Sequence, residues 1–427
     1  MKKRTRGSYC AAYADASGNI WDAPRCHPAF RTGNRFVDVA PEKLIPLPYG
    51  STLFMLPGRI PIRRSRNGRF EPLTDVPSFG EVYAVSAFCA SGYLRTYLPA
   101  FMRKSGAPVL PMWAYAGLAF HNGSYVVPAM RIDEDPRSDP AIHEDEEALL
   151  TAIKEERRRA PRNKLVEQLA TCALTYRCLC AGNFFLGRYE APVPTTPSCN
   201  ADCVGCLSHQ PSGAPFPPSQ NRLNFAPTAE DIADVIIRHF ARVENAVASF
   251  GQGCEGEPLM RAEDIARAIT LVRATTDRGT ININTNGSLP KAVRRLIDAG
   301  LDSIRVSLNS PTEEYYTRYH RPRGYRFSNV CATIAEALDA GIFVSINLFF
   351  MPGFTDMETE VESLIRFLER FPVHMIQTRN MNIDPDYYFE SIGYQESDPI
   401  GVENLINLLR ERFPAMRLGY YNPPLRI

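Results

Sequence analysis

The chain has 427 residues, more than a single hydrophobic core usually fills and enough for an α/β barrel of about 200–250 residues with a companion domain of about 150, so we expect two domains. Its 48 lysines and arginines nearly balance its 47 aspartates and glutamates, and the formal charge of +1 excludes a global field that attracts nucleic acid or an anionic membrane. Three of the eleven cysteines fall within eight residues, which is too tight for disulfides among them. We therefore expect a reducing compartment.

The N-terminus has a basic head from Lys2 to Arg6 but no apolar stretch behind it, because Asp15 interrupts a run of small residues. This pattern predicts a chain that is not secreted. The most apolar stretches, Val82–Leu94 and Val109–Phe120, are short and broken by Ser, Gly or Pro, so no membrane span is expected. We predict a cytoplasmic protein.

Residues 1–135 are rich in Pro, Gly, Tyr and Phe. Short alternating runs such as Val82–Ala87 and Ser124–Val127 lie between turn signals such as Asn122-Gly123. The pattern predicts a β-rich accessory domain.

Residues 136–189 form a charged segment that we predict to be a linker followed by helix. Apolar residues recur at helical intervals there, at Leu149, Ile153, Leu165 and Leu169. The domain boundary is expected near Pro136–Pro140.

Residues 190–413 alternate six strand-like runs with six amphipathic helices, and 414–427 are left as a C-terminal extension. The predicted strands are Ala191–Thr196, Asn245–Phe250, Thr280–Thr285, Ser303–Asn309, Phe343–Phe350 and Met375–Asn380. The predicted helices are Thr228–Val243, Ala262–Thr275, Leu289–Ala299, Phe327–Ala340, Met357–Arg370 and Val402–Phe413. Such a series predicts a parallel sheet, either a partial barrel or an open doubly wound sheet, with the active site at the carboxyl ends of its strands.

Cys199, Cys203 and Cys206 come directly after the first predicted strand, on the first loop of that face. Three thiolates at this spacing can hold a 4Fe-4S cluster and leave its fourth iron open to another ligand. The alternative is a structural zinc site, for which the nearest further ligand is His209.

A CxxxCxxC motif after the first of six βα units resembles the radical S-adenosylmethionine (radical SAM) superfamily. The resemblance implies an α/β fold, a partial (β/α)6 barrel with an N-terminal β-rich accessory domain. It also implies that the cluster binds S-adenosylmethionine and cleaves it reductively to a 5′-deoxyadenosyl radical, which abstracts hydrogen from a substrate. An electron donor such as flavodoxin or ferredoxin is expected as a partner.

Further positions agree with the family in order and spacing. Gly251–Pro258 resembles its GGE segment, Asn284–Gly287 its TNG turn, and the ends of the fourth and fifth strands its cofactor-facing positions. The resemblance implies the cofactor-binding residues Gly256, Glu257, Asn286, Ser307, Asn309 and Asn347, with Glu257 neutralising the methionine ammonium. The family often has an aromatic residue before the third cysteine, where this chain has Gly205.

Cys172, Cys178 and Cys180 are predicted either to hold an auxiliary Fe-S cluster or to lie as small buried residues on a helix Leu165–Cys180. Cys254 is expected to pack near the cofactor. Residues 207–218 and Tyr315–Tyr325 are candidates to line the mouth of the barrel.

The substrate is expected to be a small molecule or a peptide, and nucleic acid is disfavoured because a strong basic excess is missing. Two alternatives within the family are RNA modification and activation of glycyl-radical enzymes. A rival of another class is a zinc-stabilised α/β binding module without turnover.

Overall fold

The computed structural model describes residues 9–74 and 80–426, so the basic head at Lys2 lies outside the described residues. The chain forms two compact units. Unit 1 comprises Met1–Pro140, Phe349–Ser363 and Thr378–Pro414, and unit 2 comprises Ala141–Leu348, Leu364–Gln377 and Ala415–Ile427. Across the described parts of both units, no helix is long and apolar enough to cross a membrane.

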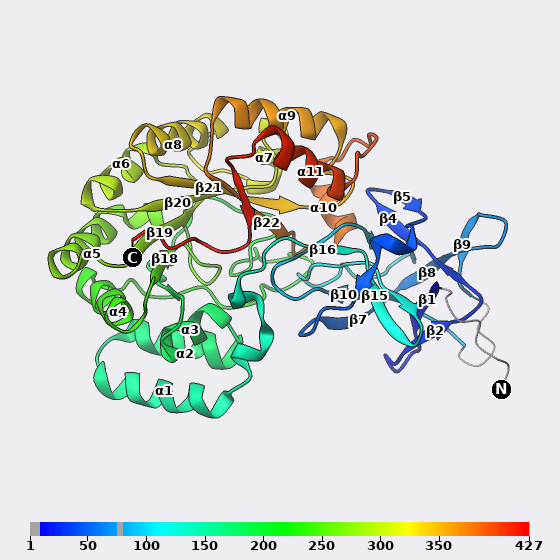
Figure 1. Ribbon diagram of the computed structural model, residues 1–427, viewed down its shortest axis with the longest axis horizontal. Helices are drawn as coiled ribbons and strands as arrows, with labels where there is room; N and C mark the ends of the chain where they lie inside the picture. Colours follow the sequence, from blue (N-terminus) through cyan, green and yellow to red (C-terminus); the bar gives the residue numbers. More distant parts are fainter. Residues whose placement is uncertain (1–8, 75–79, 427) are drawn as a thin grey trace. The chain divides into compact units, whose positions relative to one another are not determined.

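A seven-stranded sheet forms the centre of unit 2, with its strands side by side in chain order (Figure 1). Its strands are β17 (Glu190–Pro192), β18 (Val247–Phe250), β19 (Thr280–Thr285), β20 (Ser303–Leu308), β21 (Phe343–Phe350), β22 (Met375–Asn380) and β23 (Arg417–Gly419). Pairing is parallel wherever the register is defined. The fold is the predicted α/β partial barrel, in which all loops after the strands emerge on one face.

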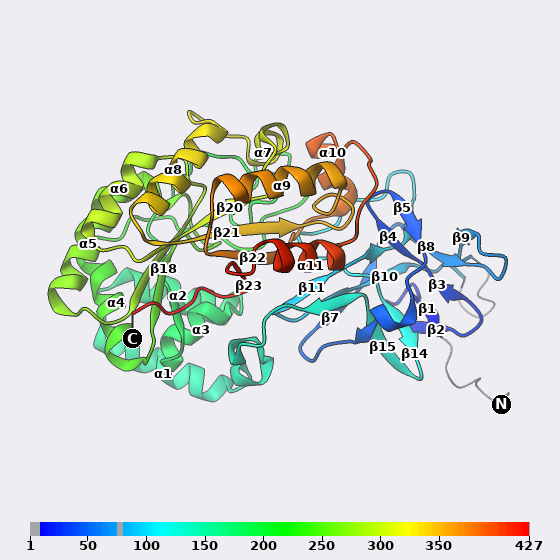
Figure 2. The ribbon, with the colours of Figure 1, turned by 45° about the horizontal axis from the view of Figure 1, so that its top comes forward.

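The six predicted helices are confirmed, with bounds that differ by at most one residue at either end. In unit 2, α4, α5, α6 and α8 cover the outer side of the sheet (Figures 1 and 2). A reciprocal capping box of Thr228 and Asp231 begins α4, and Gly300, with φ of +111°, ends α6. The helices of the series are α4 (Ala229–Arg242), α5 (Ala262–Thr275), α6 (Pro290–Ala299), α8 (Phe327–Asp339), α9 (Glu358–Arg370) and α11 (Val402–Arg412).

The helical segment predicted within 136–189 is present, but it consists of separate helices. The expected helix Leu165–Cys180 is confirmed up to Thr175 and is wrong beyond it, because Arg177 adopts φ of +49° and Cys178 is the N-cap of a new helix. The segment before the barrel instead forms α1 (Glu146–Arg159), α2 (Lys164–Thr175) and α3 (Leu179–Leu186). Two short helices, α7 (Glu313–His320) and α10 (Pro385–Ile392), and the last strand β23 were also missed.

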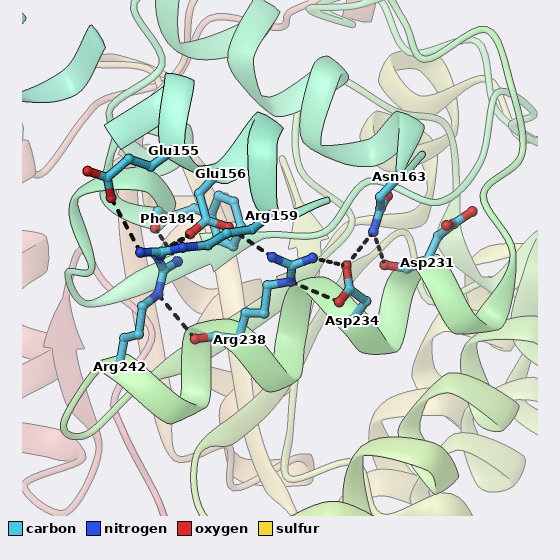
Figure 3. Close-up of polar contacts among 9 residues, drawn as sticks. All are labelled: Glu155, Glu156, Arg159, Asn163, Phe184, Asp231, Asp234, Arg238 and Arg242. Carbon is cyan, nitrogen blue, oxygen red and sulfur yellow. Dashed lines mark hydrogen bonds and ion pairs between the residues drawn. The ribbon is translucent and has the colours of Figure 1, made fainter. Parts of the chain in front are cut away.

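Buried charges hold α1 to α4 (Figure 3). The side chain of Glu156 is 2% exposed and accepts hydrogen bonds from Arg242 at 2.6 Å and Arg159 at 3.0 Å. Arg238 lies 3.5 Å away and also forms two 2.8 Å hydrogen bonds with Asp234. Three guanidinium groups around one carboxylate satisfy the requirement that a buried charge be paired.

The C-terminal segment fills part of the barrel interior. Asn422 donates to the Glu190 carboxylate at 2.8 Å and accepts from Gln377 at 2.7 Å, and Gln377 accepts from Arg305 at 2.6 Å. Figure 2 shows this segment running from β23 back toward β18. This polar chain supplies hydrogen bonds to side chains that are buried in unit 2.

Unit 1 is β-rich up to residue 131, as predicted. A five-stranded sheet has the order β2-β1-β14-β15-β6, and smaller sheets flank it. Two of the smaller sheets of unit 1 are paired to the start of α10: Arg59 on β8 forms a fully buried pair with the N-cap Asp384 at 2.8 Å, and Arg31 on β4 pairs with Asp386 at 2.6 Å. The strands are β1 (Tyr9–Ala14), β2 (Ile20–Ala23), β3 (His27–Pro28), β4 (Phe30–Thr32), β5 (Arg35–Val37), β6 (Ile45–Pro46), β7 (Thr52–Leu56), β8 (Arg59–Arg64), β9 (Phe70–Pro72), β10 (Ala84–Phe88), β11 (Tyr93–Arg95), β12 (Leu98–Pro99), β13 (Phe101–Arg103), β14 (Ala119–His121), β15 (Ser124–Val127) and β16 (Ala129–Arg131).

Candidate functional site

The three motif cysteines lie on the loop that follows β17, and each is half-buried. Burial raises the pKa of Cys199 to about 11 and that of Cys203 well above its ordinary value. The charges of the other motif thiols add to both shifts. Without a metal, burial and mutual repulsion therefore favour the protonated form of these thiols. A cationic metal centre would stabilise them as thiolates, the form that binds metal.

A segment of residues 319–323, called here the strap, runs antiparallel to the cysteine loop. Ala201 and Pro322 form a β-bridge, and the Arg323 guanidinium donates to the Cys199 carbonyl at 2.6 Å. The strap was part of the segment expected at the barrel mouth, and the structure places it against the cysteine loop. Its backbone hydrogen bonds are Val204 N to Tyr319 O (2.9 Å), Asp202 N to His320 O (3.2 Å) and Arg323 N to Asn200 O (2.8 Å).

Two of the three thiols have a nitrogen beside them that comes from outside the motif. Nδ1 of His320 lies 3.4 Å from Sγ of Cys203, and burial lowers the pKa of His320 to about 3. A guanidinium nitrogen of Arg222 donates to Sγ of Cys206 at 3.3 Å. The pattern in the sequence pointed to neither contact.

Glu255 joins the start of the cysteine loop to the loop after β18. Its carboxylate accepts from the backbone of Thr195 at 2.6 Å, Thr196 at 3.0 Å and Gly251 at 2.6 Å, and from the Thr195 hydroxyl at 2.9 Å. Burial raises its pKa to about 7 although these donors favour the ionised form. Sequence reasoning missed this residue, which lies inside the GGE-like segment.

Glu257, predicted to receive an ammonium group, is also buried. It accepts from the backbone of Asn286 at 2.8 Å and of Leu259 at 3.1 Å, and from the Thr285 hydroxyl at 2.5 Å. Burial raises its pKa to about 7. The carboxylate therefore holds the loops after β18 and β19 together, and an ammonium ligand has to share its oxygens with these donors.

Gly256 lies where two loop backbones nearly touch. A Cβ atom on Gly256 would lie 1.9 Å from the carbonyl oxygen of Ser198, and one on Gly251 would lie 1.6 Å from that of Asn284. Both contacts are with backbone, which cannot swing away as a side chain can. Glycine at these positions therefore allows the loops to meet.

The remaining predicted residues lie on the loops after β19 and β20 and on neighbouring strands. Asn286 donates from its side chain to Asn200 on the cysteine loop at 2.8 Å. Ser307 on β20 pairs in register with Asn347 on β21, so their side chains share a face. Asn309 follows directly and donates to the Tyr315 carbonyl at 3.2 Å.

The carbonyl oxygen of the Asn347 side chain is buried and has no hydrogen-bond partner in the part of the chain that the structure describes. A hydroxyl or ammonium group of a ligand could donate to this unsatisfied buried acceptor.

In residues 9–74 and 80–426, no three His, Cys, Asp or Glu side chains are already arranged as a metal site. His209, the ligand considered for zinc, is exposed. The residues that would hold a cluster are therefore the three cysteines of one loop, and the Asn347 oxygen is an acceptor that a bound cofactor could use.

The other cysteines of interest divide into two environments. The buried thiols of Cys172 and Cys254 hydrogen-bond to each other, which lowers the pKa of Cys172 and raises that of Cys254. Cys180 instead lies 3.5 Å from the Glu190 carbonyl oxygen. The contact between Cys172 and Cys254 joins α2 to the GGE-like loop and was not predicted.

Residues 193–368 match the family model of the radical SAM superfamily. Similar curated proteins include a GTP 3′,8-cyclase of Corynebacterium glutamicum, 31% identical over 42% of this chain and 48% of that protein, and molybdenum cofactor biosynthesis protein 1 of Drosophila melanogaster, 26% identical over 53% and 36%. The chain thus spans about half or less of the length of these relatives.

Among solved structures, the FeFe-hydrogenase maturase HydG from Carboxydothermus hydrogenoformans is similar at a TM-score of 0.38 and 15% identity, covering 64% of this chain and 70% of that chain. Methylornithine synthase is similar at a TM-score of 0.39 and 14% identity, covering 59% and 69%. The residues that the family model matches contain the cysteine loop, the acidic pair and the strap, so residues 193–368 of this chain match the radical SAM superfamily.

Proposed function

We propose that Cys199, Cys203 and Cys206 hold a 4Fe-4S cluster and that the chain is an enzyme that cleaves S-adenosylmethionine reductively. The observation that supports this most directly is the set of three interacting thiols on the first loop at the carboxyl ends of the strands. When bound, the cluster supplies an electron that splits the sulfonium into methionine and a 5′-deoxyadenosyl radical, which abstracts hydrogen from the substrate.

The protein's own residues have three tasks in this proposal. Ser307, Asn309 and Asn347 orient the cofactor from one face of the sheet, with the unsatisfied Asn347 oxygen as an acceptor. Glu257 and Asn286 keep the loops around it in place. The close loop contact at Gly256 excludes water from beneath the cysteine loop.

The substrate class is proposed as a small molecule or a peptide. The relatives named GTP 3′,8-cyclase make GTP the first small molecule to assay, although the chain matches only about half of their length. A reducing protein such as flavodoxin or ferredoxin is the proposed electron donor, and the cytoplasm the proposed location.

The test is anaerobic reconstitution with iron and sulfide, followed by measurement of bound iron and of 5′-deoxyadenosine. We expect about four irons per site and cofactor cleavage in the presence of dithionite. The triple replacement of Cys199, Cys203 and Cys206 by alanine should abolish cofactor cleavage and remove the iron of this cluster. Zinc in place of iron in the wild type would instead support the binding-module alternative.

The auxiliary cluster on Cys172, Cys178 and Cys180 is a second proposal, supported by the electrostatic interaction between Cys172 and Cys178. Iron that persists in the triple variant would support it, and its loss on further replacement of Cys172 would assign the ligand. An iron-free triple variant would contradict it.

A further inference from the structure

His320 is packed between two tyrosines beside Cys203. The residue ends α7 and is 2% exposed, and its ring stacks on Tyr316 with centroids 4.2 Å apart and planes 23° apart. Tyr319 meets it edge-on at 5.0 Å. Its Nε2 has no hydrogen-bond partner among the described residues, so Nδ1, 3.4 Å from Sγ of Cys203, is the ring's polar contact.

The chemistry of a ligating cysteine fixes the direction of this hydrogen bond. A thiolate has no hydrogen and can only accept. When Cys203 is a thiolate, the contact is favourable only if Nδ1 of His320 carries the hydrogen. In the observed orientation the ring stacks on Tyr316 and presents Nδ1 to Sγ of Cys203.

Arg222 makes a similar contact with Cys206. One guanidinium nitrogen lies 3.3 Å from Sγ, and Nε donates to the Ser208 hydroxyl at 3.2 Å. Ser208 in turn donates to the carbonyl of Glu255 at 3.3 Å. A half-buried guanidinium with a second anchor therefore directs a positive charge at the sulfur.

Resting on the proposed function, we propose that His320 and Arg222 are positioning residues that donate N–H hydrogen bonds to the sulfur atoms of Cys203 and Cys206 and raise the reduction potential of the cluster. One-electron reduction adds negative charge that is shared by the ligand sulfurs. Donors to these sulfurs stabilise the reduced state more than the oxidised state. Both donors come from outside the motif, 117 residues from Cys203 and 16 residues from Cys206.

The experiment is an EPR-monitored redox titration of the reconstituted full-length protein with dithionite. His320→Phe keeps an aromatic ring on Tyr316 but removes the N–H group, and Arg222→Met keeps the aliphatic stem but removes the charge. Each should lower the ratio of reduced to oxidised cluster at a fixed potential at least threefold, or about 28 mV for a one-electron couple. Arg222→Lys, which keeps the charge but loses the second anchor, should fall between Arg222→Met and the wild type.

Arg294→Met is the matched control, because Arg294 is an exposed arginine on α6 that pairs with Asp298 and Glu336. It should leave the potential unchanged. Potentials of His320→Phe and Arg222→Met equal to that of this control would overturn the inference. If His320→Phe holds no cluster, the Arg222→Met potential decides alone. A wild type without a cluster would contradict the proposed function, whereas a loaded wild type with unshifted variants contradicts only the role of these two residues.

Discussion

Replacing Glu156 by alanine should loosen α1 from α4 far more than replacing its neighbour Glu155. The Glu156 side chain is 2% exposed and lies 2.6–3.5 Å from Arg242, Arg159 and Arg238 (Figure 3). Breaking a fully buried pair costs about 3–5 kcal/mol, because the remaining charge stays buried. Here the arginine side chains are 21–54% exposed and regain water. We therefore expect a smaller loss, about 2–3 kcal/mol.

The structure also indicates how much each of the three arginines loses when Glu156 is removed. Arg238 keeps both hydrogen bonds to Asp234, and Arg159 keeps Glu155 at 3.4 Å. Arg242 retains the Phe184 carbonyl at 3.1 Å. A double-mutant cycle of Glu156 with Arg242 should therefore give the largest coupling energy of the three pairs.

Hydrogen exchange measured by mass spectrometry suits this test, because it reports the opening of α1 separately from unfolding of the whole chain. Glu155→Ala is the control, since its carboxylate is 44% exposed and its pair with Arg159 is worth about 0.5 kcal/mol or less. Equal opening free energies for the Glu155→Ala and Glu156→Ala variants would refute the assignment of Glu156 as the main link.

Three further predictions concern the loops of the site. Gly256→Ala should abolish cluster binding, because its Cβ would lie 1.9 Å from a backbone oxygen, whereas Gly182→Ala, with open space around it, should leave iron content unchanged. Glu257→Ala should keep the cluster but weaken S-adenosylmethionine binding by about 1.5–3 kcal/mol in calorimetry, and an unchanged dissociation constant would contradict this. Because burial raises the pKa of Glu255 from 4.5 to about 7, the folded state binds the proton more tightly. The contribution of Glu255 to the free energy of unfolding should be complete below pH 4.5 and fall by about 3 kcal/mol as the pH rises to 7. Urea unfolding of the metal-free Glu255→Gln variant should lack this pH dependence.

The repeating part of the fold was predictable because its signals are local. Buried parallel strands such as Thr280–Thr285 are rich in β-branched residues, and caps such as Thr228 and Gly300 mark helix ends. The last strand, Arg417–Gly419, has only three residues and is defined by its pairing with β22, which no local pattern encodes. The predicted helix Leu165–Cys180 failed for a related reason, since its apolar spacing continues through the break at Arg177.

The residues of the site also divide into those with a local sequence signal and those without one. The cysteines and the Gly256-Glu257 pair could be found because each occupies one short segment whose spacing carries the chemistry. The contacts of His320 and Arg222 depend on how the chain returns to the cysteine loop, and nothing in their own neighbourhoods distinguishes them from solvated residues. The hydrogen-bonded pair of Cys172 and Cys254 likewise joins residues that are far apart in the sequence.

Several neighbouring loops fix the conformation of the cysteine loop, so substitutions in those loops should affect binding of the cluster and the cofactor. Its first residues are fixed by Glu255, its middle by the side chain of Asn286, and its outer edge by the strap. Glu257, which clamps Asn286, is therefore two hydrogen bonds away from the cysteine loop. Substitutions at Glu255 or Asn286, whose side chains bond the cysteine loop directly, should alter cofactor affinity and cluster retention together. Substitutions at Glu257 or on the β20–β21 face, such as at Ser307, should alter cofactor affinity alone. If substitution of Asn286 changed cofactor affinity without changing cluster retention, or the reverse, the loops would act separately.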